Sequence, residues 1–269
     1  MDSNVSFSPA HAQFLRGQRR RKRLILMCQI ALLITFFAGW EVAVHLDWLE
    51  AFIFSSPSRM YAMLLNMLAA GELWRHVWIT SWEVVAGFVI GSALGIAISI
   101  ALWCNGFLHK VLNPYLVVFN SLPKTALAPI IIVWLGNNVR AIIVTALLIS
   151  VVVTVLNVLT GFMQVDDEKI KLAQSFGAKK RQMLTKVVFP ASVPDIINAL
   201  KINIGLTFVG VIVGEFLVAQ AGLGFLIVHG SQIFRMDMVM LSIIILCVLA
   251  AGFYQIIAAI ERRFINWAE

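Results

Sequence analysis

The sequence predicts an all-α, polytopic membrane protein with six transmembrane helices in one membrane domain. Hydrophobic residues make up 60% of the 269 residues and charged residues only 13%, whereas soluble domains carry roughly 25% charged residues. Apolar runs follow one another from Leu24 to Trp267 with no long polar linker between them. We therefore expect residues 24–269 to form the membrane domain, preceded by a basic cytoplasmic tail over residues 1–23.

Six stretches are long enough to cross a bilayer. A hydrocarbon core of about 30 Å requires about 20 mostly apolar residues in a helix. The stretches that meet this length are residues 24–45, 77–103, 111–135, 139–160, 195–217 and 239–261. The third is the least regular, because Pro114, Pro123, Lys124 and Pro129 lie within it.

The basic residues predict the orientation. Six spans place both termini on one side, and that side would carry 15 Lys and Arg residues against four on the other, namely Arg59, Arg75, Arg140 and Arg235. Lys and Arg accumulate in cytoplasmic loops. Both termini and the loop after the fourth span are therefore predicted to be cytoplasmic, in the bacterial inner membrane. The bilayer thus explains the net charge of +7, and nucleic acid is not expected as a partner.

The basic cluster at residues 19–23 and the apolar run after it imitate a secretory signal peptide. However, the run continues to about His45, which is too long for a signal peptide, and no clear cleavage site follows. We expect this segment to be retained as the first span. The cluster could also bind anionic lipids, but anchoring the topology is the simpler interpretation.

Glycines recur at helical spacing in two spans. Gly87, Gly91 and Gly95 lie four residues apart in the second span, and Gly210 and Gly214 repeat the pattern in the fifth. Small residues at this spacing let a second helix approach closely. Packing within the chain is favoured over a subunit interface.

The loop between the fourth and fifth spans predicts two short helices joined at a glycine. Three acidic residues at 166–168 suit the positive end of a first helix, and Gly177 suits a helix end in the left-handed conformation. A second helix is expected over residues 179–189, stopped by Pro190. Apolar faces are predicted at Ile170, Ala173 and Phe176, and at Met183, Leu184, Val187 and Val188. The pattern alone leaves open whether this is a docking knob or a solvated basic loop.

This loop resembles the EAA motif in the membrane subunits of ATP-binding-cassette importers. That motif reads Glu-Ala-Ala, three residues, Gly, nine residues, then Ile-x-Leu-Pro, and the residues in register are Ala173, Gly177, Val187, Phe189 and Pro190. Lys171 and Leu172 replace the usual Glu and first Ala, so an ion pair made by that Glu is not carried over. The resemblance assigns ATPase coupling to Lys171, Ala173, Ser175, Phe176, Gly177, Ala178, Lys179, Lys180 and Pro190.

The resemblance covers roughly Gly71 to Arg263 and is closest to the nitrate, sulfonate and taurine group of permeases. The residues that carry it are Gly71-Glu72-Leu73-Trp74, Ser121-Leu122-Pro123-Lys124-Thr125-Ala126-Leu127-Ala128-Pro129, Trp134-Leu135-Gly136, Val213-Gly214-Glu215 and Gly222-Leu223-Gly224. It implies the fold of a type I importer permease. It also implies a second permease subunit, expected to be an identical copy, two ATPase subunits and a periplasmic or extracellular solute-binding protein.

The resemblance places ATP and Mg²⁺ in the partner ATPase, and no cofactor is expected in this chain. Its sequence has no Gly-x-x-x-x-Gly-Lys-[Ser/Thr] phosphate loop. Enzyme chemistry is not predicted either, because cysteines and histidines lack ligand spacing and no nucleophile elbow occurs. The residues concerned are Cys28, Cys104, Cys247, His45, His76, His109 and His229.

Ionisable residues in the apolar stretches are candidates for the translocation pathway. A charge at the bilayer centre costs about 2.5–3.5 kcal/mol, so it usually faces the bundle interior or a wet cavity. Glu83, Lys124 and Glu215 are assigned to the pathway on this ground. Glu41 and Lys201 lie nearer span ends, where a long side chain can reach the interface.

Two of these residues leave alternatives open. Lys124, between Pro123 and Pro129, could line the route or pair within the bundle. Glu83 stands in Ser81-Trp82-Glu83, where similar permeases often read Ser-Leu-x-Arg. An acid there would suit a cationic or amine-bearing solute, whereas a buried pair with Lys124 or Lys201 would explain it equally well.

The sequence thus favours the permease subunit of an ATP-driven importer for a small solute, delivered by an external binding protein. A secondary transporter coupled to an ion gradient is the alternative, but such proteins usually show internal repeats, and none is visible. A membrane scaffold or sensor is a third class, favoured only if the loop at 166–190 binds no ATPase.

Overall fold

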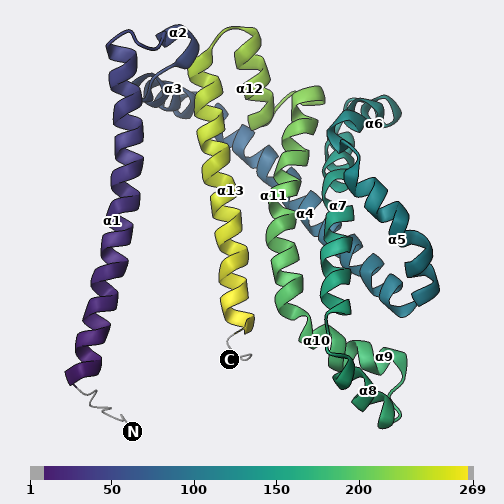
Figure 1. Ribbon diagram of the computed structural model, residues 1–269. Helices are drawn as coiled ribbons and strands as arrows, with labels where there is room; N and C mark the ends of the chain where they lie inside the picture. The colour runs from purple at the N-terminus through teal and green to yellow at the C-terminus, as the bar shows by residue number, and fades with distance from the viewer. Residues whose placement is uncertain (1–8, 266–269) are drawn as a thin grey trace. The chain divides into compact units, whose positions relative to one another are not determined.

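The computed structural model describes residues 9–265, and these residues form helices joined by short loops (Figure 1). Within this described part, no strand occurs. The chain separates into two compact units, residues Met1–Ala62 and residues Met63–Glu269.

The first unit contains α1 (Pro9–His45), α2 (Ala51–Phe54) and the start of α3 (Pro57–Ala69). Because α1 begins at Pro9, the basic cluster at residues 19–23 is part of a helix that continues into the first predicted span. The boundary between a tail and a membrane domain at residue 23 stays a prediction.

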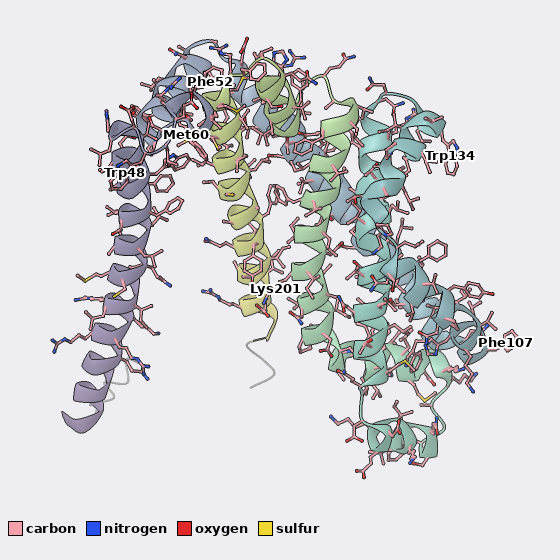
Figure 2. All side chains as sticks on the ribbon, turned by 45° about the horizontal axis from the view of Figure 1, so that its top comes forward. Trp48, Phe52, Met60, Phe107, Trp134 and Lys201 are labelled. Atoms are coloured by element: carbon pink, nitrogen blue, oxygen red, sulfur yellow. The ribbon has the colours of Figure 1, made fainter. Side chains whose placement is uncertain are left out.

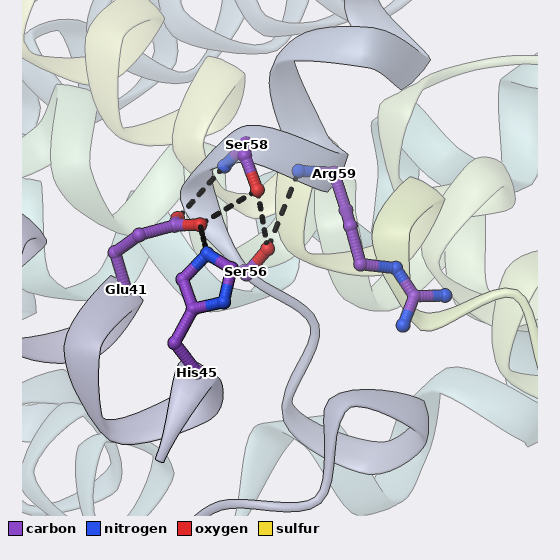
Figure 3. A network of polar contacts seen from close by, with 5 residues as sticks. All are labelled: Glu41, His45, Ser56, Ser58 and Arg59. Carbon is purple, nitrogen blue, oxygen red and sulfur yellow. Dashed lines mark hydrogen bonds and ion pairs between the residues drawn. The ribbon is translucent and has the colours of Figure 1, made fainter. Parts of the chain in front are cut away.

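Glu41, expected only to reach the interface, joins α1 to α3 (Figure 3). The backbone N–H of Ser58 donates to Glu41 Oε2 at 3.0 Å, and Ser58 Oγ donates to Oε1 at 2.7 Å. His45 lies one turn further along α1, with Nε2 3.4 Å from Glu41 Oε1. A carboxylate at the first turn of α3 satisfies a free N–H group and favours the positive end of the helix.

The second unit is built around α4 (Glu72–Cys104), α7 (Val139–Met163) and α11 (Val193–Val218), which pack side by side (Figure 1). Helix α13 (Met236–Ile265) packs on α11 and on α12. The shorter elements are α5 (Gly106–Ser121), η1 (Lys124–Leu127), α6 (Ala128–Leu135), α8 (Asp167–Ser175), α9 (Lys180–Met183), η2 (Leu184–Val188), α10 (Phe189–Ala191) and α12 (Leu223–Gln232).

Five described helices are long and apolar enough to cross a membrane, and a bent pair supplies a sixth crossing if it is counted as one span. That pair is α5 with η1 and α6, bent by 86°. The third predicted span, over residues 111–135, therefore lies in a bent pair of helices and is not one continuous helix. The break falls at Leu122 and Pro123, because a proline disfavours helical backbone in the residue before it.

The helical glycines allow α7 to pack closely against α4 and α11, which confirms the prediction of packing within the chain. A side-chain carbon at Gly95 would lie 2.6 Å from Thr154 Cγ2, and one at Gly214 would lie 2.9 Å from the backbone of Ile142. One at Gly210 would overlap the backbone of Ala146. Asn203 Nδ2 also donates to Ser92 Oγ at 2.7 Å across the α11–α4 interface. Small residues and interhelical hydrogen bonds are the main means by which helices associate in lipid.

The end of the bundle that carries α8–α10 also carries the end of α13, while α12 and the starts of α7 and α13 lie at the opposite end (Figure 1). The loop at 166–190 and residue 262 are thus on one side, away from Arg140 and Arg235. Within the second unit, this arrangement agrees with the two groups of basic residues in the sequence.

Candidate functional site

The loop at 166–190 forms a compact elbow, here defined as residues 166–191. Its first helix, α8, begins where Asp166 Oδ1 accepts a hydrogen bond from the backbone N–H of Glu168 at 2.9 Å. It ends at Ser175, two residues before Gly177, which has a φ of +77°, and the Ala178 N–H donates back to the Ala173 carbonyl at 3.0 Å. Both the acidic start and the left-handed glycine were predicted, and both are confirmed.

The second half of the elbow is helical beyond its predicted end. Helix α9, the π-helical turn η2 and α10 follow one another from Lys180 to Ala191 without a loop. The expectation that Pro190 stops this helix is therefore wrong. Pro190 lies in the first turn of α10, where its fixed φ suits helical backbone and its missing N–H is tolerated. The chain turns two residues later at Ser192, whose Oγ donates to the Gly161 carbonyl at 3.1 Å.

The elbow is attached to the bundle by the predicted apolar stripe on its second half. Leu184 and Val188 are buried in a cluster with Phe162 of α7, and Lys180 Nζ donates to the Cys104 carbonyl at 3.0 Å. A hydrophobic side faces the bundle, so the elbow cannot swing freely around its glycine.

The other side of the elbow exposes apolar groups between basic ones. Phe176 is 84% exposed, and Leu172 is also exposed. Both border a shallow groove whose other lining residues are Lys169, Ala173, Lys186 and Val187. Phe176 was predicted to share an apolar face of α8 with Ile170 and Ala173; Ile170 packs against the bundle, whereas Phe176 is exposed. The nine residues assigned to coupling lie together in this elbow, with Lys171, Ser175, Phe176, Gly177, Lys179 and Lys180 exposed and Ala173, Ala178 and Pro190 half-buried.

A second cluster lies at the opposite end of the bundle, where Glu83 of α4 and Glu215 of α11 meet. Both residues are 1% exposed, and their carboxyl groups are hydrogen-bonded to each other. Thr80 Oγ1 donates to Glu215 Oε1 at 2.6 Å, and the Gly224 N–H donates to Oε2 at 2.5 Å. Glu215 therefore holds the turn between α11 and α12 against α4.

Glycine is required in that turn. Gly222 has a φ of +129°, and a side-chain carbon there would lie 2.5 Å from the Glu215 carboxyl group. Its N–H donates to His76 Nδ1 at 3.0 Å, and the next N–H, of Leu223, donates to Thr80 Oγ1 at 2.8 Å. Successive backbone donors are thus satisfied by side chains of α4.

The structure brings together two of the three pathway candidates. Lys124 lies away from the acidic pair, in η1, where its Nζ donates to Asn120 Oδ1 at 3.2 Å. Lys201 forms an ion pair with Glu261 of α13. A pair between Glu83 and Lys124 or Lys201, offered above as one explanation, is therefore wrong, because Glu83 pairs with an acid instead.

His76 and Thr80 were not predicted from the sequence as partners of this cluster. Their signal was periodicity, since residues 76, 80, 83, 87 and 91 continue one line of α4 at spacings of three and four. Gly87, Gly91 and Glu83 on that line were predicted to have roles, whereas His76 and Thr80 were not.

A cavity of about 430 Å³ adjoins Glu83. It lies between the first turns of α4, the start of α7 and the end of α11, with Trp78, Trp82 and Ile142 among its lining residues. Other exposed aromatic side chains, Phe107 and Trp134, project away from the bundle along the edge formed by α5 and α6 (Figure 2).

Comparison with known proteins gives a family match and relatives along most of the chain. Residues 87–266 match the family described as binding-protein-dependent transport system inner membrane component. SsuC of Bacillus subtilis, assigned to aliphatic sulfonate transport, is 25% identical over 97% of this chain and 95% of its own. The taurine transport system permease protein TauC of Escherichia coli is 24% identical over 96% of this chain and 95% of its own.

The fold also matches a solved structure. A chain of the MetNI methionine ABC transporter in an inward-facing conformation aligns with a TM-score of 0.66 at 20% identity, covering 74% of this chain and 98% of that one. At this identity the match concerns the fold, which is that of a type I importer permease.

Proposed function

Because the chain belongs to the family of inner membrane components of binding-protein-dependent transport systems, we propose that it couples ATP hydrolysis by a partner ATPase to solute import through its elbow. The chain is the membrane-spanning permease subunit of an ABC importer. The observation that supports the coupling role is the exposed face of the elbow, where Phe176 projects from a helical pair that is otherwise fixed to the bundle.

This face has the chemistry of a docking surface. Exposed apolar side chains rimmed by polar groups mark protein interaction sites. The elbow carries Phe176 and Leu172 between Lys171, Lys179 and Lys180. Phe176 would act as the aromatic anchor in a groove of the ATPase, and the lysines would meet acidic groups at the groove's rim.

The proposed assembly contains two permease subunits, expected to be identical, and two ATPase subunits. One chain offers one elbow, and the ATPases of this class act as pairs, so each ATPase would receive one elbow. ATP and Mg²⁺ would be bound by the ATPase subunits. A solute-binding protein would dock at the opposite end of the bundle, on the outer face of the membrane.

The solute is proposed to be a small organic molecule. The relatives SsuC and TauC are named for aliphatic sulfonates and taurine. The proposed route passes the end of the bundle where Glu83 and Glu215 meet. Lys124, on η1, is proposed to line the route where the helix of the third crossing is broken.

The test is a matched pair of phenylalanine substitutions in the full complex reconstituted in vesicles. Phe176→Ala should weaken ATPase binding by about 30-fold, the equivalent of about 2 kcal/mol for a central aromatic anchor, and ATP-driven uptake should fall with it. Phe234→Ala removes an exposed phenylalanine between α12 and α13, at the other end of the bundle. It should leave ATPase binding unchanged. Equal binding by both variants would reject the elbow as the docking surface.

The same vesicles separate this function from ion-coupled transport. Uptake should require ATP on the elbow side and should persist when ionophores collapse all ion gradients. Uptake driven by an imposed ion gradient without ATP would favour the secondary transporter.

A further inference from the structure

Glu83 has an unusual position among the acidic residues of the chain. It is 1% exposed, and one of its oxygens, Oε2, is buried without a hydrogen-bond partner. An unpaired buried acceptor costs about 1–3 kcal/mol, so such an atom in a native protein requires an explanation.

Glu215, the hydrogen-bonded neighbour of Glu83, has no unpaired oxygen of this kind. Both oxygens of Glu215 already accept hydrogen bonds, one from Thr80 and one from Gly224. The Glu215 side chain is thus committed to holding the α11–α12 turn. Glu83 is the member of the pair that is left able to accept a hydrogen bond from a ligand.

The unpaired oxygen belongs to a residue that lines a cavity of ligand size. The cavity of about 430 Å³ falls within the range of small-molecule sites, about 300–1,000 Å³. Among the residues that the structure describes, Glu83 is the one ionisable side chain in its lining. Apolar groups of Ile142 and Val218 and the amide side chains of Asn137 and Gln220 also line the cavity. One acidic group among apolar ones would orient a small amphipathic solute.

The electrostatics of the cavity favour a cation. Glu83 lines it and is hydrogen-bonded to Glu215, and in the described part of the chain no basic side chain pairs with either of these carboxyl groups. Two further lining residues, Trp78 and Trp82, have exposed indole rings, whose faces attract an ammonium group when it approaches within about 6 Å. An anionic group at the same place would meet the acidic pair.

From this geometry we infer that the cavity is a binding site for a primary ammonium group, which donates to Glu83 Oε2 while the rest of the solute lies against Ile142 and Val218. The inference deepens the proposed function and rests on it, because it makes an amine-bearing small molecule the solute class. The apolar volume leaves room for a short carbon chain.

The test uses ethylammonium chloride as the probe and the purified full-length chain in lipid nanodiscs. Binding is measured by saturation-transfer NMR on the ethylammonium signals. Ethanol and sodium ethanesulfonate serve as probes of the same carbon chain without the ammonium group. Ethylammonium should show saturable transfer, and the other two should show none that saturates in the same range. Equal transfer from ethanol would overturn the proposal.

Two substitutions locate the site. Glu83→Gln should weaken ethylammonium binding about tenfold or more, as expected for loss of a charge-assisted hydrogen bond. Glu72→Gln, on the exposed first turn of the same helix, should not weaken it. Ala219→Trp places a large side chain in the cavity lining and keeps both carboxyl groups. It should abolish binding, and it tests the site even if Glu83→Gln fails to fold. Unchanged binding in Ala219→Trp would place the site elsewhere.

The ethylammonium measurement needs neither ATP nor a partner protein, so its result tests the amine site separately from the proposed coupling function. If ethylammonium binds and the Phe176→Ala variant still couples normally, the amine-binding site is supported and the elbow is rejected as the ATPase-docking surface. Loss of coupling in Phe176→Ala without any ethylammonium binding would keep the importer and reject the amine site.

Discussion

At the scale of single residues, Gly177 and Thr80 have defined structural tasks. Gly177 has positive φ and open space around the position of a side-chain carbon, so only its backbone conformation restricts substitution. Thr80 has the opposite character, because its hydroxyl is buried and bonded on both sides. Substitution of Gly177 should therefore act through backbone strain, and substitution of Thr80 through the loss of hydrogen bonds.

Gly177→Val should uncouple ATP hydrolysis from transport while the protein still inserts into the membrane. A β-branched residue at positive φ costs on the order of 1–2 kcal/mol, and relief of that strain would change the direction of α8 relative to α9, which is attached to the bundle. Uptake and ATPase binding in vesicles are the readouts. Gly177→Asn is the matched control, since Asn tolerates the left-handed conformation, and it should retain most activity. Normal uptake by Gly177→Val would show that the angle of the elbow is irrelevant.

Thr80→Val should destabilise the protein by about 1–3 kcal/mol, because it leaves a buried carboxyl oxygen and the Leu223 N–H without their partner. Thermal unfolding in detergent measures the loss. Thr160→Val on α7 is the control: its hydroxyl is exposed and bonds only its own helix, to the Leu156 carbonyl at 2.7 Å. A similar melting temperature for both variants would mean that the turn is held without Thr80.

At the scale of helices, packing depends on where α7 meets its neighbours. Helix α11 carries three glycines, and two of them, Gly210 and Gly214, face the α7 backbone, whereas Gly205 has open space beside it. The same residue type thus serves close packing at two positions and has no packing role at the third. This contrast provides an internal test.

Gly210→Ala and Gly205→Ala should change stability in opposite directions. A methyl group at 210 would overlap the Ala146 backbone and force the helices apart, at a cost of about 1–3 kcal/mol. The same methyl group at 205 meets nothing within 4 Å and should stabilise α11 by up to about 1 kcal/mol through helix propensity. Unfolding of both variants under identical detergent conditions measures the difference. A stabilising Gly210→Ala would contradict the close approach of α7 and α11.

At the scale of the whole molecule, the basic residues predict the orientation of the chain in the membrane. Within the second unit, the elbow and the last residues of α13 share one end of the bundle, and Arg140 and Arg235 lie at the other. The basic asymmetry predicts that the elbow end is cytoplasmic.

Cysteine labelling from outside intact cells should therefore reach positions 59 and 235 and miss positions 18 and 180. The three native cysteines, Cys28, Cys104 and Cys247, are first replaced by serine so that each introduced thiol reports alone. Labelling after permeabilisation confirms that the silent positions are reactive. External labelling at 180 would reverse the proposed topology.

Native mass spectrometry of the assembled transporter should give two permease and two ATPase subunits. A stable complex of one permease with one ATPase that still hydrolyses ATP in response to solute would contradict this stoichiometry. This measurement counts subunits in the assembled complex, so its result does not depend on the elbow variants.

The sequence by itself determined the features that depend on local chemistry. Apolar run length specifies a membrane helix wherever it occurs, glycine spacing predicts a face for close packing, and three acids followed by a glycine predict a short capped helix. These features were read correctly because each is decided within a few turns of chain. The loop motif also identified the permease class before any fold was seen.

Only the tertiary structure decided which distant groups meet. The bend at Pro123 and the continuation of helix through Pro190 show that a proline acts according to its place in a helical turn, which its presence in the sequence does not reveal. The pairing of Glu83 with Glu215 joins residues 132 positions apart on different helices. A lysine partner was one of two alternatives that the sequence left open, but packing of α4 against α11 and the donors of Thr80 and Gly224 place a second acid there. Partners across helices follow from how the helices pack, and that depends on the whole bundle.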